Sequence, residues 1–349
     1  MELRVGITPV HYCKGKGAEV INRRLESFER VDAGGHQSDQ LTLVVYTGAD
    51  PGLPAADGLP EEDAVLDWFE GYEERGPVRI GAFRITRITP RLFPPRVTIV
   101  ATAAPFGTKD ETGFKERRTR SWSKPTLGDL FRAIVKAHGL DARVDPELDP
   151  IPLGHIDQTS ETDAAFLSRL AREHDAVAKP MDGMYLLALR GRTTTISGEP
   201  MDNVVLTVPP NNTPKNPHFI NCETDNPSRK KVGGVIACWK DEATGKTHEE
   251  RLGEAPYRKL PGVYVNREHA LQSLKGQSRK AKREKKRLTL DIPGDPYLSA
   301  EMPLTLDKSF PHGMAGEMSI DRLVARGTRD GGYRMSIEAT TPIKDEKKQ

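Results

Sequence analysis

The sequence predicts a β-rich α+β protein with two related β domains and a small α/β domain between them. Three observations support this prediction: short segments of alternating apolar and polar residues, a similar order of such segments near both ends of the chain, and two amphipathic helical segments between them. We expect the first β domain at 1–105, the α/β domain at 106–190, the second β domain at 191–342, and a disordered tail at 343–349.

The two β domains are predicted from an internal repeat. LTL at 41–43, FRITRI at 83–88 and VTIVATAAP at 97–105 are followed, in the same order, by LTL at 288–290, MSIDRL at 318–323 and MSIEATTP at 335–342. Period-two alternation predicts that each segment is a strand, with Phe83, Ile85 and Arg87 on one face. A proline ends each last strand because it cannot donate to a ladder. The repeat predicts two superimposable domains, which suit a ring better than a single active site.

The α/β domain at 106–190 is predicted from two capped amphipathic helices and a hairpin. The first helix, at 126–140, has Thr126 as its N-cap and Gly139 as its C-terminal stop. The second, at 158–175, is capped by Ser160 or Thr162 and buries an apolar face. A hairpin at 176–189 turns at its Asp-Gly pair. We expect these elements to pack together outside the β domains.

The second β domain contains a strongly basic helix. The sequence predicts strands at NPHFIN, GGVIACWK and THEERL, the last two paired as a hairpin, followed by a helix at 266–287. This helix carries nine Lys or Arg and two Glu, with a thin apolar stripe of Ala270, Leu271, Leu274 and Ala281. A segment at 57–74 has the opposite character, with eight acidic residues and no basic one.

Composition excludes several classes of protein. Of the 349 residues, 36% are hydrophobic and 29% are charged, which is typical of a polar, soluble chain; the net charge of +2 gives no general attraction to nucleic acid. No apolar run is long enough to span a bilayer, and the N-terminus lacks the basic and apolar regions of a signal peptide. Three unpaired cysteines indicate a reducing compartment without structural disulfides.

No segment predicts catalysis, a cofactor or a metal. ATGKT at 243–247 lacks the first glycine of a phosphate-binding loop, so Gly245 is predicted to be a hairpin turn residue. His174 is interpreted as a satisfied or partly exposed structural histidine, and the histidines show no metal-binding spacing. We therefore predict a protein that is not an enzyme.

The basic helix is the strongest binding candidate. A docking surface for protein is favoured over nucleic acid because no aromatic residue interrupts the charges, so bases would find no stacking partner. The basic and acidic stretches are predicted to pair within a chain or between chains. The candidate interface residues are Lys280, Lys282, Arg283, Lys285, Lys286 and Arg287 on the basic side, and Glu61, Glu62 and Asp63 on the acidic side.

Three segments together resemble the late control gene D family of phage tail proteins. They are TRSWSKPTLGDLFRAIVKAHGL at 119–140, HIDQTSETDAAFLSRLAREHDAVAKPMDGMYLLAL at 155–189 and LTLDIPGDPYLSAEMPLTL at 288–306. The middle segment is the most specific, with its Gln-Thr start, Phe-Leu-x-x-Leu-Ala helix and hairpin. The resemblance covers nearly the whole chain and is weak at 191–265; the glycine-rich 307–318 is atypical.

The resemblance implies a contractile-tail baseplate hub of a phage or an R-type-pyocin-like bacteriocin, similar in plan to the N-terminal part of valine-glycine-repeat spike proteins. Such hubs are homotrimers with two tube-like antiparallel β-barrels per chain, which adapt a sixfold tail tube to a threefold central spike. The implied partners are the tail tube protein and the spike, expected as a separate polypeptide, with baseplate wedge and tape-measure proteins as further candidates. The implied location is the particle baseplate, assembled in the host cytoplasm.

Two other functions remain as alternatives to a hub. One is a tail-associated peptidoglycan hydrolase, which requires converging acidic groups or a zinc site. The other is a nucleic-acid-binding module acting through residues 267–287.

Overall fold

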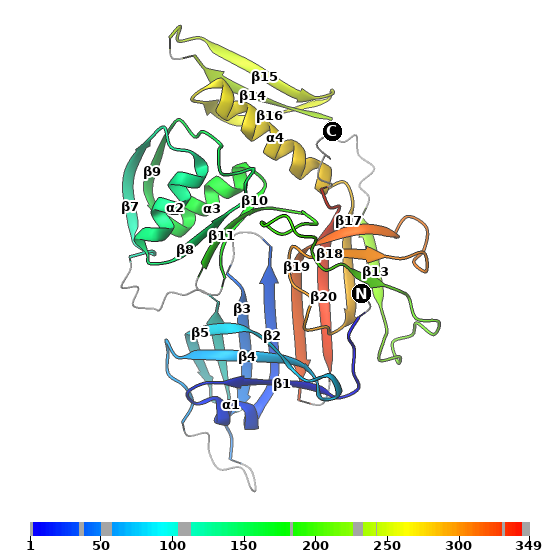
Figure 1. The fold of residues 1–349 in the computed structure, drawn as a ribbon. Helices are drawn as coiled ribbons and strands as arrows, with labels where there is room; N and C mark the ends of the chain where they lie inside the picture. Colours follow the sequence, from blue (N-terminus) through cyan, green and yellow to red (C-terminus); the bar gives the residue numbers. More distant parts are fainter. Residues whose placement is uncertain are drawn as a thin grey trace.

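The protein is built from three groups of elements, which Figure 1 shows as a large sheet, an α/β part and a small sheet with one helix. The computed structural model describes residues 3–34, 38–49, 58–103, 113–181, 184–225, 233–241, 243–329 and 332–343. Strands predominate and most of their pairs are antiparallel, so the predicted β-rich α+β class is confirmed.

The large sheet has twelve strands from both ends of the chain. Its main path is β1-β4-β5-β6-β3-β2-β19-β20-β17-β13, and β18 pairs with both β19 and β12. The N-terminal strands are β1 (Pro9–Lys14), β2 (Leu25–Ala33), β3 (Gln40–Tyr46), β4 (Val65–Tyr72), β5 (Val78–Arg91) and β6 (Arg96–Thr102). The C-terminal strands are β12 (Val204–Leu206), β13 (Asn221–Asp225), β17 (Arg287–Pro293), β18 (Pro303–Leu306), β19 (Gly316–Thr328) and β20 (Tyr333–Thr340).

Two short helices accompany the N-terminal strands, and the sequence analysis predicted neither. They are α1 (Ala18–Arg24) and the single 3-10 turn η1 (Glu73–Arg75). Helix α1 buries Ala18 and Ile21 against the sheet. A helix of this length is stabilised by packing rather than by its own propensity, which explains why its sequence signal is weak.

The α/β part matches the predicted helices and hairpin. Helix α2 (Leu127–Ala137) is capped by Thr126 Oγ1, which accepts a hydrogen bond from Asp129 N at 3.1 Å. Helix α3 (Asp163–Glu173) is capped in the same way by Thr162, one of the two predicted caps. The strands are β7 (Arg117–Ser123) with β9 (His155–Thr162), and β10 (Ala176–Met181) with β11 (Met184–Leu189) and β8 (Asp141–Val144). The predicted turn at 182–183 lies outside the described residues.

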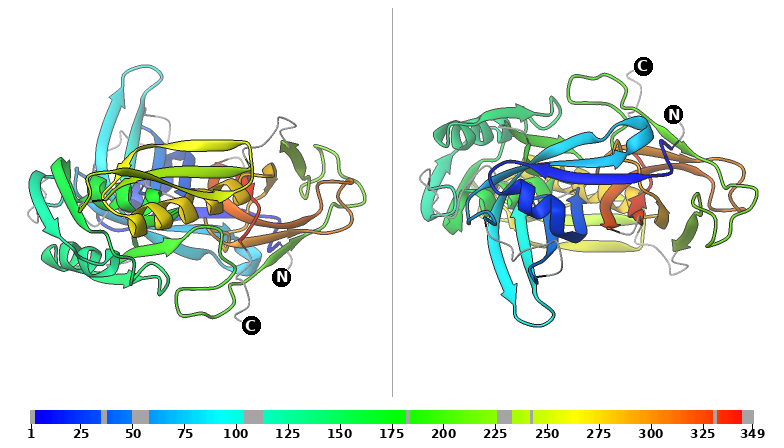
Figure 2. Two further views of the ribbon diagram at one scale, coloured as in Figure 1. Left: turned by 90° about the horizontal axis from the view of Figure 1, so that it is seen from above. Right: turned by 90° about the horizontal axis from the view of Figure 1, so that it is seen from below.

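The small sheet corrects the prediction for the region of the basic helix. Strands β14 (Gly234–Lys240), β15 (Thr247–Gly253) and β16 (Tyr257–Tyr264) form a separate sheet, covered by α4 (Arg267–Arg283) as Figure 2 shows from above. Val235, Ala237, Leu260, Ala270 and Leu274 form its own apolar core. The predicted β14–β15 hairpin is confirmed. The helix, however, lies on this sheet rather than in a β-barrel, and it ends at Arg283 instead of residue 287.

The internal repeat is present in the strand pairing itself. The order β4-β5-β6-β3-β2 in the first half matches β18-β19-β20-β17-β13 in the second half, antiparallel at every step. The register also matches: Ile85 faces Ala101, and Ala101 faces Leu41, just as Ile320 faces Ala339, and Ala339 faces Leu288. FRITRI and MSIDRL therefore occupy equivalent strands, as predicted.

A β-bulge occurs at the same place in both copies and corrects the predicted alternation. The register shifts between Ile85 and Arg87 in β5 and between Ile320 and Arg322 in β19. An extra residue in one strand moves the following side chains to the other face. Consequently Arg87 is exposed, and Ile88, expected on the opposite face from Phe83 and Ile85, packs against the same core as they do.

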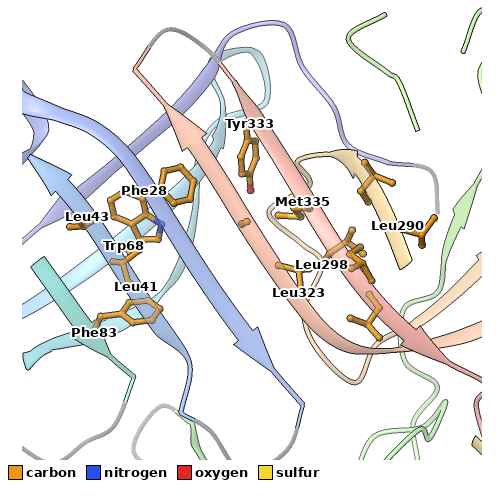
Figure 3. Packing of buried hydrophobic residues seen from close by; sticks show 14 of the residues in the cluster. Phe28, Leu41, Leu43, Trp68, Phe83, Leu290, Leu298, Leu323, Tyr333 and Met335 are labelled. Atoms are coloured by element: carbon orange, nitrogen blue, oxygen red, sulfur yellow. The ribbon is translucent and has the colours of Figure 1, made fainter. Parts of the chain in front are cut away.

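One apolar cluster runs through both copies of the repeat. Figure 3 shows part of it, with Phe28, Trp68 and Phe83 from the first copy and Leu323, Tyr333 and Met335 from the second. The Glu70 carboxylate, with no exposed surface, accepts hydrogen bonds from Arg30 (2.7 Å), Trp68 (2.8 Å) and Tyr333 (2.8 Å). A buried charge is tolerated when its hydrogen bonds are satisfied, so this cluster ties the two copies together.

The predicted domain boundaries at 105 and 190 remain a proposal. Ile343, the first residue of the tail predicted at 343–349, is ordered, because its N–H donates to Gly191 O at 2.8 Å; residues 344–349 lie outside the described residues.

Candidate assembly interface

Only some of the basic residues predicted to form an interface are exposed to solvent. Lys280, Lys282, Lys285 and Arg287 are exposed at the C-terminal end of α4 and just beyond it. Lys286 is half-buried, and its Nζ donates to the Met314 carbonyl oxygen at 2.8 Å. The exposed side chains remain candidates for an interface.

Arg283 corrects the prediction, because it is a buried structural residue. Its side chain is 2% exposed, and its Nε and one terminal nitrogen each donate to the Asp175 carboxylate at 3.0 Å. The other terminal nitrogen donates to Asp321 Oδ1 and Thr340 Oγ1, both at 2.8 Å. The favourable contacts with Asp175 outweigh burial and raise the pKa of Arg283. This residue joins α4, the end of α3 and the second copy of the repeat, so it is not available to another chain.

The predicted acidic side lies at the start of β4. Glu61 and Glu62 are exposed, and Asp63 is half-buried at a left-handed φ of 67°, where its N–H donates to Ile85 O. Glu301 is its counterpart in the second copy, with a φ of 68° and the same hydrogen bond to Ile320 O. No ion pair among the described residues joins this stretch to the basic one. Pairing between chains therefore remains a proposal.

Open strand edges among the described strands of the large sheet include one on β5 and one on β13, besides the outer edges of β1 and β12. Strand β5 pairs with β4 only as far as Arg84, which leaves one edge of Arg87–Arg91 open beyond the bulge. Strand β13 is the last strand of the path and pairs only with β17, at the outer edge of the sheet in Figure 1. Such edges present unpaired N–H and C=O groups and are ready-made sites for pairing.

An exposed apolar tip follows the open edge of β5. Leu92 is 95% exposed and Phe93 is 84% exposed, in the turn between β5 and β6. In both views of Figure 2 this hairpin projects from the body of the protein. The sequence analysis missed this site. Its signal was two adjacent apolar residues in a turn, a position where polar residues and glycine are usual.

The two groups considered for chemistry, His174 and Gly245, lie in different parts of the fold. His174 is fully buried at the C-terminal end of α3, and neither ring nitrogen has a hydrogen-bond partner among the described residues, so the predicted satisfied or partly exposed histidine is wrong. Burial lowers the pKa of His174 to about 4. Gly245 has a φ of 68° in the β14–β15 turn, as predicted.

Two negative findings hold for the part of the chain that the structure describes. It contains no group of three or more His, Cys, Asp or Glu side chains placed to hold a metal ion. None of its helices combines the length and apolar character that crossing a membrane requires.

Curated relatives in sequence are phage proteins. The chain is 36% identical over 188 residues to the "Probable baseplate hub protein" of Escherichia phage 186. It is 35% identical over 188 residues to the protein of the same name in Escherichia phage P2. The first match covers 53% of this chain and 45% of the relative, so the chain spans about half the length of the relatives it matches. The chain matches no protein-family model.

Solved structures with the same fold include tail proteins and a component of a secretion system. A tail protein from Neisseria meningitidis superposes with a TM-score of 0.66 at 13% identity, covering 95% of this chain and 96% of its own. A prophage tail protein from Shewanella oneidensis gives 0.65 at 15% identity, covering 96% and 99%. An Escherichia coli type VI secretion component, described as similar to the T4 tail proteins gp27 and gp5, gives 0.53 at 10% identity, covering 92% and 74%. In fold over nearly its whole length, and in sequence over 188 residues, the chain therefore resembles phage tail and baseplate hub proteins, as the sequence analysis predicted.

Proposed function

We propose that this chain is a structural hub of a contractile-tail baseplate, in which three copies form a ring between the sixfold tail tube and the threefold central spike. The single observation that carries the proposal is the duplicated five-strand unit, which repeats its register and its bulge in one continuous sheet. Similarity to two phage proteins named as probable baseplate hubs supports the same function.

The arrangement of the two copies supports the proposed ring. They are joined side by side through β2 and β19, which is a head-to-tail contact because two different edges of the repeated unit meet. A head-to-tail contact that repeats gives a ring when the rotation closes, as we propose for three chains here. Three chains then supply six similar units, the number required to face a sixfold tube.

The partners in this proposal are the tail tube protein and a spike protein, with wedge and tape-measure proteins around them, in a particle assembled in the bacterial cytoplasm. The role is mechanical, with no turnover of a substrate. The exposed Lys280, Lys282 and Lys285 are proposed to contact an acidic surface, with Glu61 and Glu62 as candidates on a neighbouring chain.

Mass measurement tests the ring. We expect the purified chain of 38.7 kDa to form a particle of three times that mass, and averaged electron micrographs to show six lobes around an open centre. A monomer at micromolar concentration, or a twofold dimer, would contradict the proposal. Cell-wall cleavage that one carboxylate substitution abolishes would favour the hydrolase instead.

A further inference from the structure

The junction between the two copies within one chain has a defined geometry. Strand β2 pairs antiparallel with β19, with Glu29 opposite Arg326 and Val31 opposite Val324. The Arg326 guanidinium contacts the Glu29 carboxylate at 2.8 Å. This junction lies beyond the bulge of β19, on the edge that β18 leaves free.

The repeat places a second, open junction on each chain. By register, Arg91 in β5 is the counterpart of Arg326, and Thr89 is the counterpart of Val324. In the same way, Glu223 in β13 is the counterpart of Glu29, and Asp225 is the counterpart of Val31. The open edges of β5 and β13 are therefore the two halves of the contact that β19 and β2 already make.

We propose that the open edge of β5 in one copy of this chain pairs antiparallel with the open edge of β13 in a second copy, with Thr89 opposite Asp225 and Arg91 opposite Glu223. This inference rests on the proposed ring and names its contact between chains. Each chain offers one β5 edge, in the first copy of the repeat, and one β13 edge, in the second copy, so the pairing propagates from chain to chain.

The charges on the two open edges fit this register. Arg91 and Glu223 are both exposed, and neither makes an ion pair with another described residue. They would repeat across chains the ion pair that Arg326 and Glu29 make within the chain. Opposite charges directly across an antiparallel pair stabilise it, whereas like charges destabilise it.

The side chains one step beyond Arg91 and Glu223 are also complementary in size. Within the chain, Phe28 packs over Gly327, where an added Cβ would lie 2.3 Å from the Phe28 ring. Continuing the register by one step places Leu92 at the glycine position and Cys222 at the phenylalanine position. Within the chain, the large Phe28 lies against the small Gly327, whereas between chains the small Cys222 would lie against the large Leu92. The exposed Leu92 side chain would then gain a packing partner.

Pro90 makes the open junction weaker than the closed one. Its counterpart is Ala325, opposite Arg30. Gly34 N donates to Asp321 O and Arg329 N donates to Glu26 O, so alternation places Ala325 at a hydrogen-bonded position. Pro90 has no N–H, so the contact between chains has one donor fewer. Proline on an edge strand also limits uncontrolled pairing.

Disulfide trapping in the full chain tests the register. Thr89 and Asp225 form a non-hydrogen-bonded pair in the proposed register, with Cα atoms about 4.5 Å apart, a separation that suits a disulfide. In a Cys222→Ser background, we expect Thr89→Cys with Asp225→Cys to give a covalently closed trimer on mild oxidation. The matched control, Thr89→Cys with Thr224→Cys, is one residue out of register and should give none.

Each outcome separates the register from the ring. Trimers by mass that do not cross-link would overturn the proposed junction and leave the ring intact. Equal cross-linking of both variants would overturn the register. A monomer that does not cross-link would overturn the junction and the ring together.

A charge exchange gives a second measurement of the same contact. Arg91→Glu or Glu223→Arg alone should weaken association about fivefold, and the two together should restore it. Two single substitutions without effect would overturn the pairing of Arg91 with Glu223.

Discussion

Arg283 offers the sharpest test of how the three groups of elements are held together. Replacing it with methionine keeps most of the side-chain length and removes five donors. Asp321 retains Arg190, which donates to it at 2.7 Å, but Asp175 loses both of its 3.0 Å hydrogen bonds from Arg283. Asp175 is 5% exposed, so its carboxylate would stay buried without an ion-pair partner, although the more distant Arg279 would still act on it.

The expected cost follows from that unpaired carboxylate. Removing one partner of a buried ion pair costs about 3–5 kcal/mol, because the remaining charge is left without compensation. Neutralising Asp175 as well should recover part of the loss, so Arg283→Met with Asp175→Asn should be more stable than Arg283→Met alone. A coupling of about 0.5–3 kcal/mol is typical of residues in direct contact.

Urea unfolding, followed by tryptophan fluorescence and by hydrogen exchange in α4, would measure this loss. The matched control is Lys282→Ala, an exposed neighbour on the same helix, which should change stability by less than about 0.5 kcal/mol. If Arg283→Met costs no more than Lys282→Ala, or if neutralising Asp175 recovers nothing, the buried junction does not stabilise the protein. Reversing all the charges at this helix end would therefore unfold the protein before it tested any interface.

Three further predictions concern the α/β part and its contact with α4. Phe166→Ala removes a ring with no exposed surface and should cost about 3–5 kcal/mol; a denaturation midpoint equal to wild type would contradict the packing. Gly276→Ala places a Cβ 2.4 Å from the Glu173 carbonyl oxygen, so it should destabilise the protein, although alanine is more favourable than glycine in a helix by about 1 kcal/mol. The control, Ser278→Ala, should leave the stability nearly unchanged. Since burial holds the pKa of His174 near 4 against 6.5 for the free side chain, up to about 3 kcal/mol of stability should be lost as pH falls from 6.5 to 4. His174→Leu should remove this loss. If the urea midpoint depends on pH in the same way in His174→Leu and in the wild type, His174 is not the cause of the loss.

Local patterns in the sequence predicted much of the fold. Thr126 and Thr162 cap their helices because capping depends on residues three positions apart. Alternation located β3, β5, β6, β17, β19 and β20, but the strand predicted at NPHFIN is wrong, because β13 begins only at Asn221, the last residue of that segment. Alternation also misplaced Arg87, because a bulge inserts a residue that a period of two cannot anticipate.

The candidate interface was harder to predict because it depends on contacts distant in sequence. Arg283 belongs to a run of basic residues that is typical of a solvated helix end, and only its position against Asp175 and Asp321 makes it a core residue. The open edge of β5 is invisible until the extent of its pairing with β4 is known. The internal repeat in the sequence nevertheless shows that this edge of β5 corresponds to the edge of β19 that pairs with β2.

The two copies of the repeat share a backbone geometry but differ in what their bulges contact. The bulge residue of the second copy, Asp321, receives Arg283 and Arg190, and so connects the sheet to α4 and to the end of the α/β part. Its counterpart in the first copy, Thr86, donates instead to Val100 O within its own sheet. The bulge thus has the same position in both copies, while its side chain contacts the additional layers only in the second copy. In the proposed ring, six similar sheet units would face the tube, and the added layers would occur only three times, because each chain contains one α/β part and one small sheet with α4.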